Sequence, residues 1–256
     1  MNERKPLGIK SYGTIPLLPN SRVTPADKHC HEGQARIATE RARDRHDEII
    51  VQEKLDGSNV GVALVDGCIV ALTRAGYLAR TSPFEQHWHW ANWVESYKER
   101  FLAVLKENGE RLCGEWLMQA HGTRYALLHE PFVAFDIMKE HHRVPYDEFI
   151  LRVRYGNFTI PHLLHKGQPI SVQYALSLVG EHGYHGAIDE IEGVVWRVQR
   201  RGEVDFLVKY LKPYKEDGIF LPEKSGGNSI WNWYPSGYTI NQKEAVACTP
   251  THKGEG

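Results

Sequence analysis

The stretch Glu53-Lys54-Leu55-Asp56-Gly57-Ser58-Asn59 joins two short apolar runs, residues 49–51 and 60–65. Both runs are rich in β-branched residues and bounded by turn formers, which predicts two strands, with Lys54 at the end of the first. A lysine beside such a turn is often only a solvated surface residue. The functional interpretation is a nucleophile, because an amine held among other cations or in a dry pocket loses proton affinity and can attack a phosphoryl centre.

Length and composition are those of a globular protein. The chain has 256 residues, of which 41% are hydrophobic and 25% charged, enough for a sizeable core. Its formal net charge of −1 provides no overall attraction to nucleic acid, so such binding would need a local basic face. The cysteines, at positions 30, 68, 113 and 248, lack paired spacing, which predicts reduced thiols. No membrane-length apolar run or signal-peptide core is visible, and a cytoplasmic location is expected.

The pattern downstream is mainly that of strands. Strands are expected at 49–54, 60–65, 68–73, 111–118, 132–138, 191–199 and 204–211, and Asp66-Gly67 predicts a two-residue hairpin turn. Shorter helices are expected within 32–47 and at 146–154 and 171–181. Because strands outnumber helices and several pair as hairpins, an α+β fold with largely antiparallel sheets is favoured over a parallel doubly wound fold.

One longer helix is expected after Ser82-Pro83, with Ser82 as its N-cap. Apolar residues recur at three- and four-residue spacing from Phe84 through Trp88 to Val104, which predicts a face turned to the core. The tryptophans of this segment could instead stack on nucleic-acid bases, but aromatic residues at helical spacing usually belong to a core. The core interpretation is favoured.

The chain is divided into three parts. Residues 1–48 are expected to be an arm and a short helix that pack on the core, and residues 49–215 the main domain. Residues 216–256 are a short extension, and its end, 249–256, is expected to be disordered.

Polar clusters lie in or at the ends of the predicted strands: Thr73-Arg74, Gly114-Glu115, Phe135-Asp136, Glu192-Gly193 and Lys209. Carboxylates are seldom buried without a partner, so each is either ion-paired or placed at a site. An ordinary salt bridge explains any single one of them. The occurrence of all five clusters in this order is harder to explain by separate salt bridges.

With these residues the chain resembles the covalent nucleotidyltransferases, the superfamily of nucleic-acid ligases and mRNA capping enzymes. Lys54-Leu55-Asp56-Gly57 resembles motif I, and the polar clusters follow in the order of motifs Ia, III, IIIa, IV and V. The chain is most similar to RNA ligases of the phage RNA ligase 2 and RNA-editing ligase group. There, motif I continues to Ser/Thr-Asn and an arm like residues 15–22 precedes the core. The resemblance spans about residues 10–215 and implies an active site between two sheets.

The resemblance implies an ATP-dependent RNA ligase of RNA repair. Lys54 would form a lysyl-AMP, and AMP would pass to a 5′-phosphate end that is then joined to a 3′-hydroxyl. Catalytic roles fall on Lys54, Lys209, Glu192 and Arg74, with Glu192 holding Mg²⁺, or Mn²⁺ as a substitute. Lys209 and Arg74 are expected to lower the pKa of Lys54. The expected nucleotide contacts are Glu53, Lys54, Asn59, Arg74, Glu115 (ribose), Phe135 (purine), Lys209 and Lys212.

Two features depart from the family pattern. Motif V usually carries two lysines one residue apart, whereas here Leu211 occupies the second position; Lys212 takes that role only if the strand ends or bulges. The extension is too short for the family's usual further domain, so a minimal enzyme, closure by the extension or a protein partner is expected. Alternatives are a DNA or nick ligase, a GTP-using capping-type transferase, and a non-catalytic module that binds nucleic-acid ends.

Overall fold

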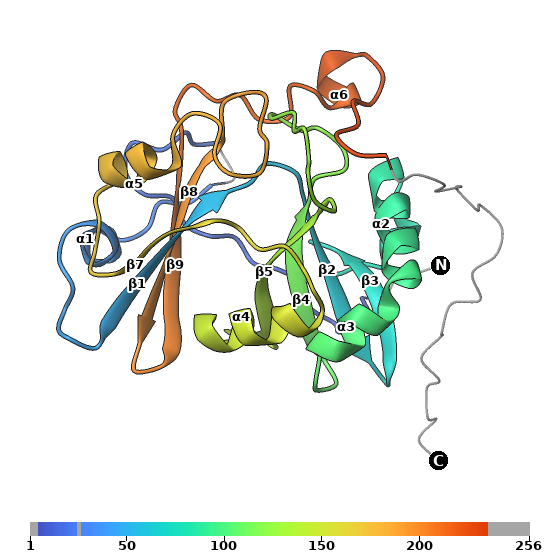
Figure 1. Cartoon of the computed structure of the whole chain (residues 1–256), viewed down its shortest axis with the longest axis horizontal. Helices are drawn as coiled ribbons and strands as arrows, with labels where there is room; N and C mark the ends of the chain where they lie inside the picture. The colour runs from blue at the N-terminus through green and yellow to red at the C-terminus, as the bar shows by residue number, and fades with distance from the viewer. Residues whose placement is uncertain (1–4, 25–26, 235–256) are drawn as a thin grey trace.

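Two antiparallel sheets stand side by side in the computed structural model, which describes residues 5–24 and 27–234 (Figure 1). One sheet has the strand order β7-β1-β8-β9 and the other the order β3-β2-β4-β5-β6. Every ladder between these strands is antiparallel. The predicted α+β fold with largely antiparallel sheets is therefore confirmed.

The four-stranded sheet consists of β1 Asp47–Lys54, β7 Leu163–Gly167, β8 Gly193–Arg200 and β9 Glu203–Leu211. The five-stranded sheet consists of β2 Ser58–Val65, β3 Cys68–Thr73, β4 Glu110–Trp116, β5 Phe132–Lys139 and β6 His142–Arg143. The helices are α1 Glu32–Thr39, α2 Glu85–Ser96, α3 Lys98–Val104, α4 Tyr146–Tyr155, α5 Val172–Val179 and α6 Pro222–Ser225, with a 3₁₀ turn η1 at Ala79–Thr81. Strands β6 and β7 were not predicted from the sequence.

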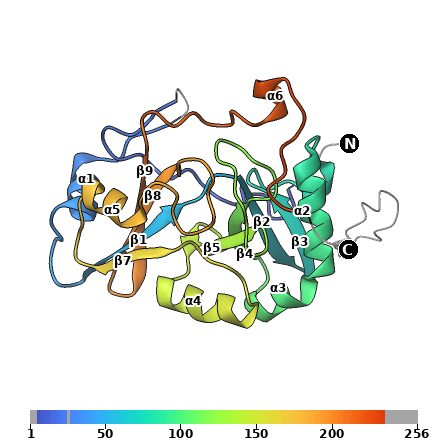
Figure 2. The ribbon, with the colours of Figure 1, turned by 45° about the horizontal axis from the view of Figure 1, so that its top comes forward.

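An aromatic core lies between the five-stranded sheet and helices α2 and α3, which cover its outer face (Figure 2). Trp90 and Trp93 of α2 are buried against Trp116 and Phe132 of the sheet. The core interpretation of these two tryptophans is confirmed, and burial of such side chains contributes about 2 to 3 kcal/mol each.

The predicted long helix is wrong in its details. It begins at Glu85 with Phe84 as the capping residue, not at Ser82, and Tyr97 (φ −120°, ψ 22°) separates α2 from α3. Phe84 and Trp88 are also 44% and 39% exposed, because the buried stripe runs through Trp90, Trp93 and Phe101 instead.

A second core lies under the four-stranded sheet, where α1 and α5 pack. Trp196 of β8 is fully buried there, beside Val51 of β1 and Ala175 of α5. Helix α5 begins as the sequence predicts, since the Ser171 hydroxyl accepts a hydrogen bond from the Tyr174 amide. The two sheets thus have separate apolar cores, and their polar residues gather between them.

Two extended segments link the sheets. The N-terminal arm runs along β9, where the Leu18 amide donates to the Lys209 carbonyl and the Lys209 amide to that of Pro16. After β9 the chain crosses back, and the Phe220 amide donates to the His121 carbonyl and the Asn232 amide to that of Met118. Both segments therefore border the space between the sheets.

The remaining expectations concern the C-terminal residues, the cysteines and membrane-spanning segments. Residues 249–256, expected to be disordered, lie outside the described residues. Cys30 and Cys113 have free thiols as expected, whereas Cys68 is disulfide-bonded, which corrects the prediction for that residue. Within the described ranges, no helix is both long and apolar enough to cross a bilayer.

Candidate active site between the two sheets

A cavity of about 740 Å³ lies between the sheets. Both sheets and the arm contribute to its walls, because the ends of β1 and β8 face strands β2, β4 and β5. The predicted site residues that line it are Glu53, Lys54, Asn59, Arg74, Glu115, Phe135, Glu192 and Lys209. Folding therefore brings together residues that are up to 156 positions apart in the sequence.

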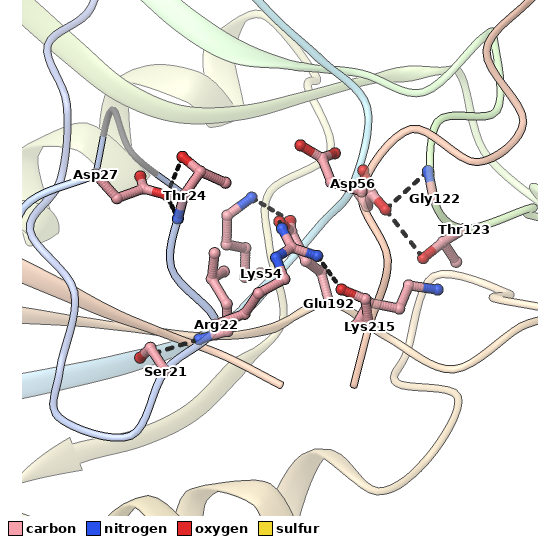
Figure 3. A network of polar contacts seen from close by, with 12 residues as sticks. Ser21, Arg22, Thr24, Asp27, Lys54, Asp56, Gly122, Thr123, Glu192 and Lys215 are labelled. Atoms are coloured by element: carbon pink, nitrogen blue, oxygen red, sulfur yellow. Dashed lines mark hydrogen bonds and ion pairs between the residues drawn. The ribbon is translucent and has the colours of Figure 1, made fainter. Parts of the chain in front are cut away.

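Lys54 and Glu192 both line this cavity, and Figure 3 shows the contact between their side chains. Lys54 lies at the end of β1, directly opposite Gly193 of β8, so that its Nζ is 2.5 Å from Glu192 Oε2. Nζ also donates to the Leu55 carbonyl at 3.0 Å. The second oxygen of Glu192 accepts from Arg22 Nη2 of the arm at 3.3 Å. The lysine is therefore held as half of a partly buried ion pair.

The pKa of Lys54 is raised. Burial alone would lower it, but the negative charges of Glu192, Glu115 and Asp56 outweigh burial. The prediction that neighbouring cations lower the pKa of Lys54 is therefore wrong for the protein without a nucleotide. Lys209 behaves differently: burial and then the Lys54 ammonium lower its pKa.

Two further carboxylates lie beside this pair, and burial is the main cause of their altered pKa values. The pKa of Glu115 is raised to about 7 and that of Asp56 to about 8, in both cases with a contribution from Glu192. Glu115 accepts from the Gly57 amide at 3.1 Å, and Asp56 from the Gly122 amide at 3.0 Å. Three carboxylates, those of Glu192, Glu115 and Asp56, therefore act on the Lys54 ammonium.

A divalent cation fits the chemistry of this region, because hard cations prefer carboxylate oxygens. No group of three or more side chains in the described part of the chain is arranged as a complete metal site. Glu192 as a single protein ligand agrees with Mg²⁺, which keeps several of its waters.

Phe135 enters the cavity through an irregularity in β5. Cys113 pairs with Asp136 and Gly114 with Ala134, so Phe135 is the extra residue of a β-bulge. Its ring meets Tyr12 edge to face, with 4.9 Å between centroids. The bulge changes the direction of the Phe135 side chain, which the regular alternation of a strand would place elsewhere.

Asp136 supports this wall. Its buried carboxylate accepts from the Tyr12 hydroxyl, from Arg143 Nε at 3.2 Å and from Arg197. Arg197 also donates to the Phe135 carbonyl at 3.1 Å. The sequence suggested a supporting role for Asp136, and its contacts agree with that suggestion.

Glu53, Asn59 and Arg74 also line the cavity. Glu53 Oε2 accepts from the Tyr184 amide at 2.9 Å, whereas Glu53 Oε1 and Asn59 Oδ1 are buried without a partner among the described residues. Burial raises the pKa of Glu53 to about 7. Arg74 lies exposed at the mouth, with Nη2 3.3 Å from Thr14 Oγ1.

Lys212 is the one predicted nucleotide contact that does not line the cavity. Strand β9 ends at Leu211, and Lys212 forms an ion pair with Glu190 at 2.8 Å instead of lining the cavity. Contact between Lys212 and a nucleotide would require this ion pair to open.

Sequence reasoning missed several residues of the site. Arg22 contacts Glu192, and the Ser58 hydroxyl lies 3.1 Å from His87 Nε2, whose Nδ1 lies 2.6 Å from Ser82 Oγ. Burial, followed by the charge of His121, lowers the pKa of His87 to about 4, so that its ring is neutral at pH 7. No local sequence signal marks His87, because its partners are set by tertiary structure alone.

The fold is shared with solved structures of an RNA ligase from Naegleria gruberi. A mutant of that enzyme with ATP and Mn has 18% identity and a TM-score of 0.51, covering 77% of this chain and 58% of that one. The same enzyme with PPi has 19% identity and a TM-score of 0.51, covering 79% and 59%. A further mutant with AMP and Mn has 17% identity and a TM-score of 0.50, covering 79% and 60%. The matched region is therefore less than two thirds of that enzyme.

Curated proteins and family models were compared as well. No curated protein matches the chain. The model of the RNA ligase family matches residues 47–211, which include β1 to β9 and thus both walls of the cavity. Because this match covers more than half of the sequence, the chain belongs to the RNA ligase family.

Proposed function

We propose that this protein is an ATP-dependent RNA ligase with Lys54 as its nucleophile. The observation that carries the proposal is the partly buried Lys54–Glu192 pair, inside a cavity lined by every predicted site residue except Lys212. The Naegleria gruberi enzyme, which shares the fold, has been solved with ATP and Mn, with AMP and Mn and with PPi.

The reaction begins at the Lys54 amine. Nζ attacks the α-phosphorus of ATP, forms a nitrogen–phosphorus bond and expels pyrophosphate. Because the amine must first lose its proton, an acceptor is needed, and Glu192 Oε2 at 2.5 Å is the closest acceptor observed. A 5′-phosphate end then takes AMP from Lys54, and a 3′-hydroxyl displaces AMP to leave a phosphodiester.

The remaining residues position the nucleotide in this proposal. Lys209 and Arg74 stabilise negative charge on the phosphates, Glu115 binds the ribose and Phe135 stacks on the purine. Glu53 and Asn59, which also line the cavity, complete the nucleotide contacts. Glu192 would hold Mg²⁺ or Mn²⁺, and the ion would neutralise charge at the phosphate oxygens.

The arm belongs to the same machinery. Arg22 holds Glu192 Oε1, and the Lys215 carbonyl accepts from the same guanidinium. The division of the chain expected at residues 48 and 215 therefore separates parts that act together. We expect removal of residues 1–48 to abolish activity.

Covalent labelling tests the proposal. The purified protein is incubated with ATP labelled in the α-phosphate and Mg²⁺, then denatured, beside Lys54→Ala and the control Lys98→Ala, whose lysine is exposed on α3. Label is expected on the wild type and on the control, released by pyrophosphate, and absent from Lys54→Ala. Transfer to 5′-phosphorylated RNA but not DNA is then expected.

Two results would contradict the proposal. No label with ATP, GTP or NAD, and with Mn²⁺ as well as Mg²⁺, together with retained RNA binding, would favour the non-catalytic module that binds nucleic-acid ends. Label from GTP alone would favour the capping-type transferase. A protein partner is a separate hypothesis, which label on the isolated chain would make unnecessary.

A further inference from the structure

A second cavity, of about 470 Å³, lies where the arm crosses the five-stranded sheet. Its charged lining residues are Lys5, Lys10, Arg111, Glu140 and Arg143, and we call it the arginine cavity. The lining therefore carries four cations and one carboxylate. The cavity contains none of the residues assigned above to the nucleotide or to Lys54.

Arg111 carries a charge that no carboxylate balances. Its side chain is 2% exposed, and its guanidinium donates to the backbone carbonyls of Ser11 at 3.1 Å, Gly109 at 3.4 Å and Glu140. No ion pair joins it to an acidic residue in the described part of the chain. A buried cation without a counter-charge is unusual, because buried charges are normally paired.

Among the described residues, Arg143 shares its one carboxylate partner with another arginine. Asp136 accepts from Arg143 at 3.2 Å and also from Arg197, which is itself 3% exposed. Three arginines at least partly buried in this region, at positions 111, 143 and 197, thus have one carboxylate between them. Arginine cannot relieve the excess by losing a proton, so the excess of positive charge persists at all physiological pH values.

The arginine cavity adjoins the active-site cavity. Gly13 lines both cavities, and its carbonyl lies 3.5 Å from Arg74 Nη2. The Arg74 carbonyl in turn accepts from the Ser11 amide at 3.1 Å. Arg74, Gly13 and Lys10 are therefore neighbours, and Arg74 is one of the residues assigned above to the phosphates.

We propose that the arginine cavity binds backbone phosphates of the RNA strand whose end lies at Lys54, an inference that rests on the proposed function. Lysine and arginine side chains are the usual partners of nucleic-acid phosphates, and such contacts position a strand without reading its sequence. The cavity gives the protein the local basic face that its net charge of −1 does not provide.

RNA binding at several salt concentrations tests this inference. The double variant Lys5→Gln/Lys10→Gln removes two cavity cations, and Lys98→Gln/Lys106→Gln removes two exposed lysines elsewhere as the matched control. Affinity for a labelled, 5′-phosphorylated single-stranded RNA is measured by fluorescence anisotropy from 50 to 200 mM KCl. Loss of two phosphate contacts should reduce the salt slope by about 1.4 and weaken binding about tenfold at low salt.

The outcomes separate the cavity from the active site. Labelling of Lys54 by ATP should be unchanged in both double variants, because it needs no RNA. An unchanged salt slope in Lys5→Gln/Lys10→Gln, and in the charge reversal Lys10→Glu, would overturn the inference. So would a loss of pyrophosphate binding with unchanged RNA binding, since the cavity would then hold a free anion. Absence of label on the wild type would instead contradict the ligase proposal.

Discussion

Two regions of the space between the sheets combine carboxylates and cations in different arrangements. At one end the carboxylates of Glu192, Glu115 and Asp56 surround Lys54, with Arg22 beyond Glu192. At the other end Asp136 is the one carboxylate paired with Arg143 and Arg197, among the residues that the structure describes. In the first region, called the acidic end below, carboxylates surround a lysine, and in the second, called the basic end, arginines surround a carboxylate.

Because of this difference, the two ends should respond differently to pH and to bound ions. Burial, with a smaller contribution from Glu192, raises the pKa of Glu115 to about 7 and that of Asp56 to about 8, so these carboxyl groups can take up protons. Buried arginines keep their protons and need an anion instead. The acidic end should therefore depend on pH and on cations, and the basic end on anions.

The largest expected effect is at the basic end. Asp136→Asn leaves two arginines without their carboxylate, and breaking such a buried pair costs about 3 to 5 kcal/mol. The free energy of unfolding, determined in urea for the wild type and the variant, gives this loss of stability. Asp147→Asn, which removes an exposed partner of Lys166, is the control and should cost at most about 1 kcal/mol. Equal losses in both variants would show that the charge excess at this end is unimportant.

At the acidic end, Glu192→Gln should lower the pKa of Lys54, because it removes the nearest of the charges that raise it. A fall of one pKa unit makes the amine about tenfold more available well below that pKa. The rate at which an acylating reagent modifies Lys54, followed by mass spectrometry at pH 9, should rise accordingly. Glu190→Gln, which changes the partner of Lys212, should leave the rate unchanged.

Glu53 tests the pH dependence of the acidic end. Its pKa is raised from 4.5 to about 7 in the folded protein, so the stability present below pH 4.5 is lost as the pH rises through about 7. Glu53→Gln keeps an acceptor for the Tyr184 amide and removes this loss. The variant should be more stable than the wild type by about 1 to 3 kcal/mol at pH 8 and similar at pH 4. Thermal unfolding at pH 4 and pH 8 measures this difference in stability between variant and wild type, with the exposed Glu203→Gln as control. A difference in stability that is the same at both pH values would contradict the raised pKa of Glu53.

The smallest effect is expected for Lys212→Ala. Its ion pair with Glu190 is partly exposed, and such pairs contribute at most about 1 kcal/mol. The labelling rate of Lys54 should remain within about twofold, because Lys212 does not line the cavity. A tenfold or greater loss of labelling would instead support the family-based prediction that Lys212 binds the nucleotide.

Local patterns in the sequence were sufficient for much of the fold. Strand alternation located β1 to β5, β8 and β9, and Asp66-Gly67 does form a hairpin turn, with φ of 48° and 78°. Strand β7 was missed because it is a partly exposed edge strand, with a weaker apolar pattern than the central strands. The start of α2 was misplaced because the hydroxyl of Ser82 is close to the ring of His87 instead of capping the helix.

The sequence by itself determined the order and chemical type of the candidate site residues, because motif spacing and strand periodicity are local properties of the chain. Tertiary structure alone decided how they behave. The Lys54 pKa depends on Glu192, 138 positions away, and Phe135 reaches the cavity only through a bulge against β4. The arginine excess likewise depends on contacts such as that of Arg111 with Ser11, 100 positions away. Coulomb energies and burial follow distances in space, which neighbouring residues in a sequence do not specify.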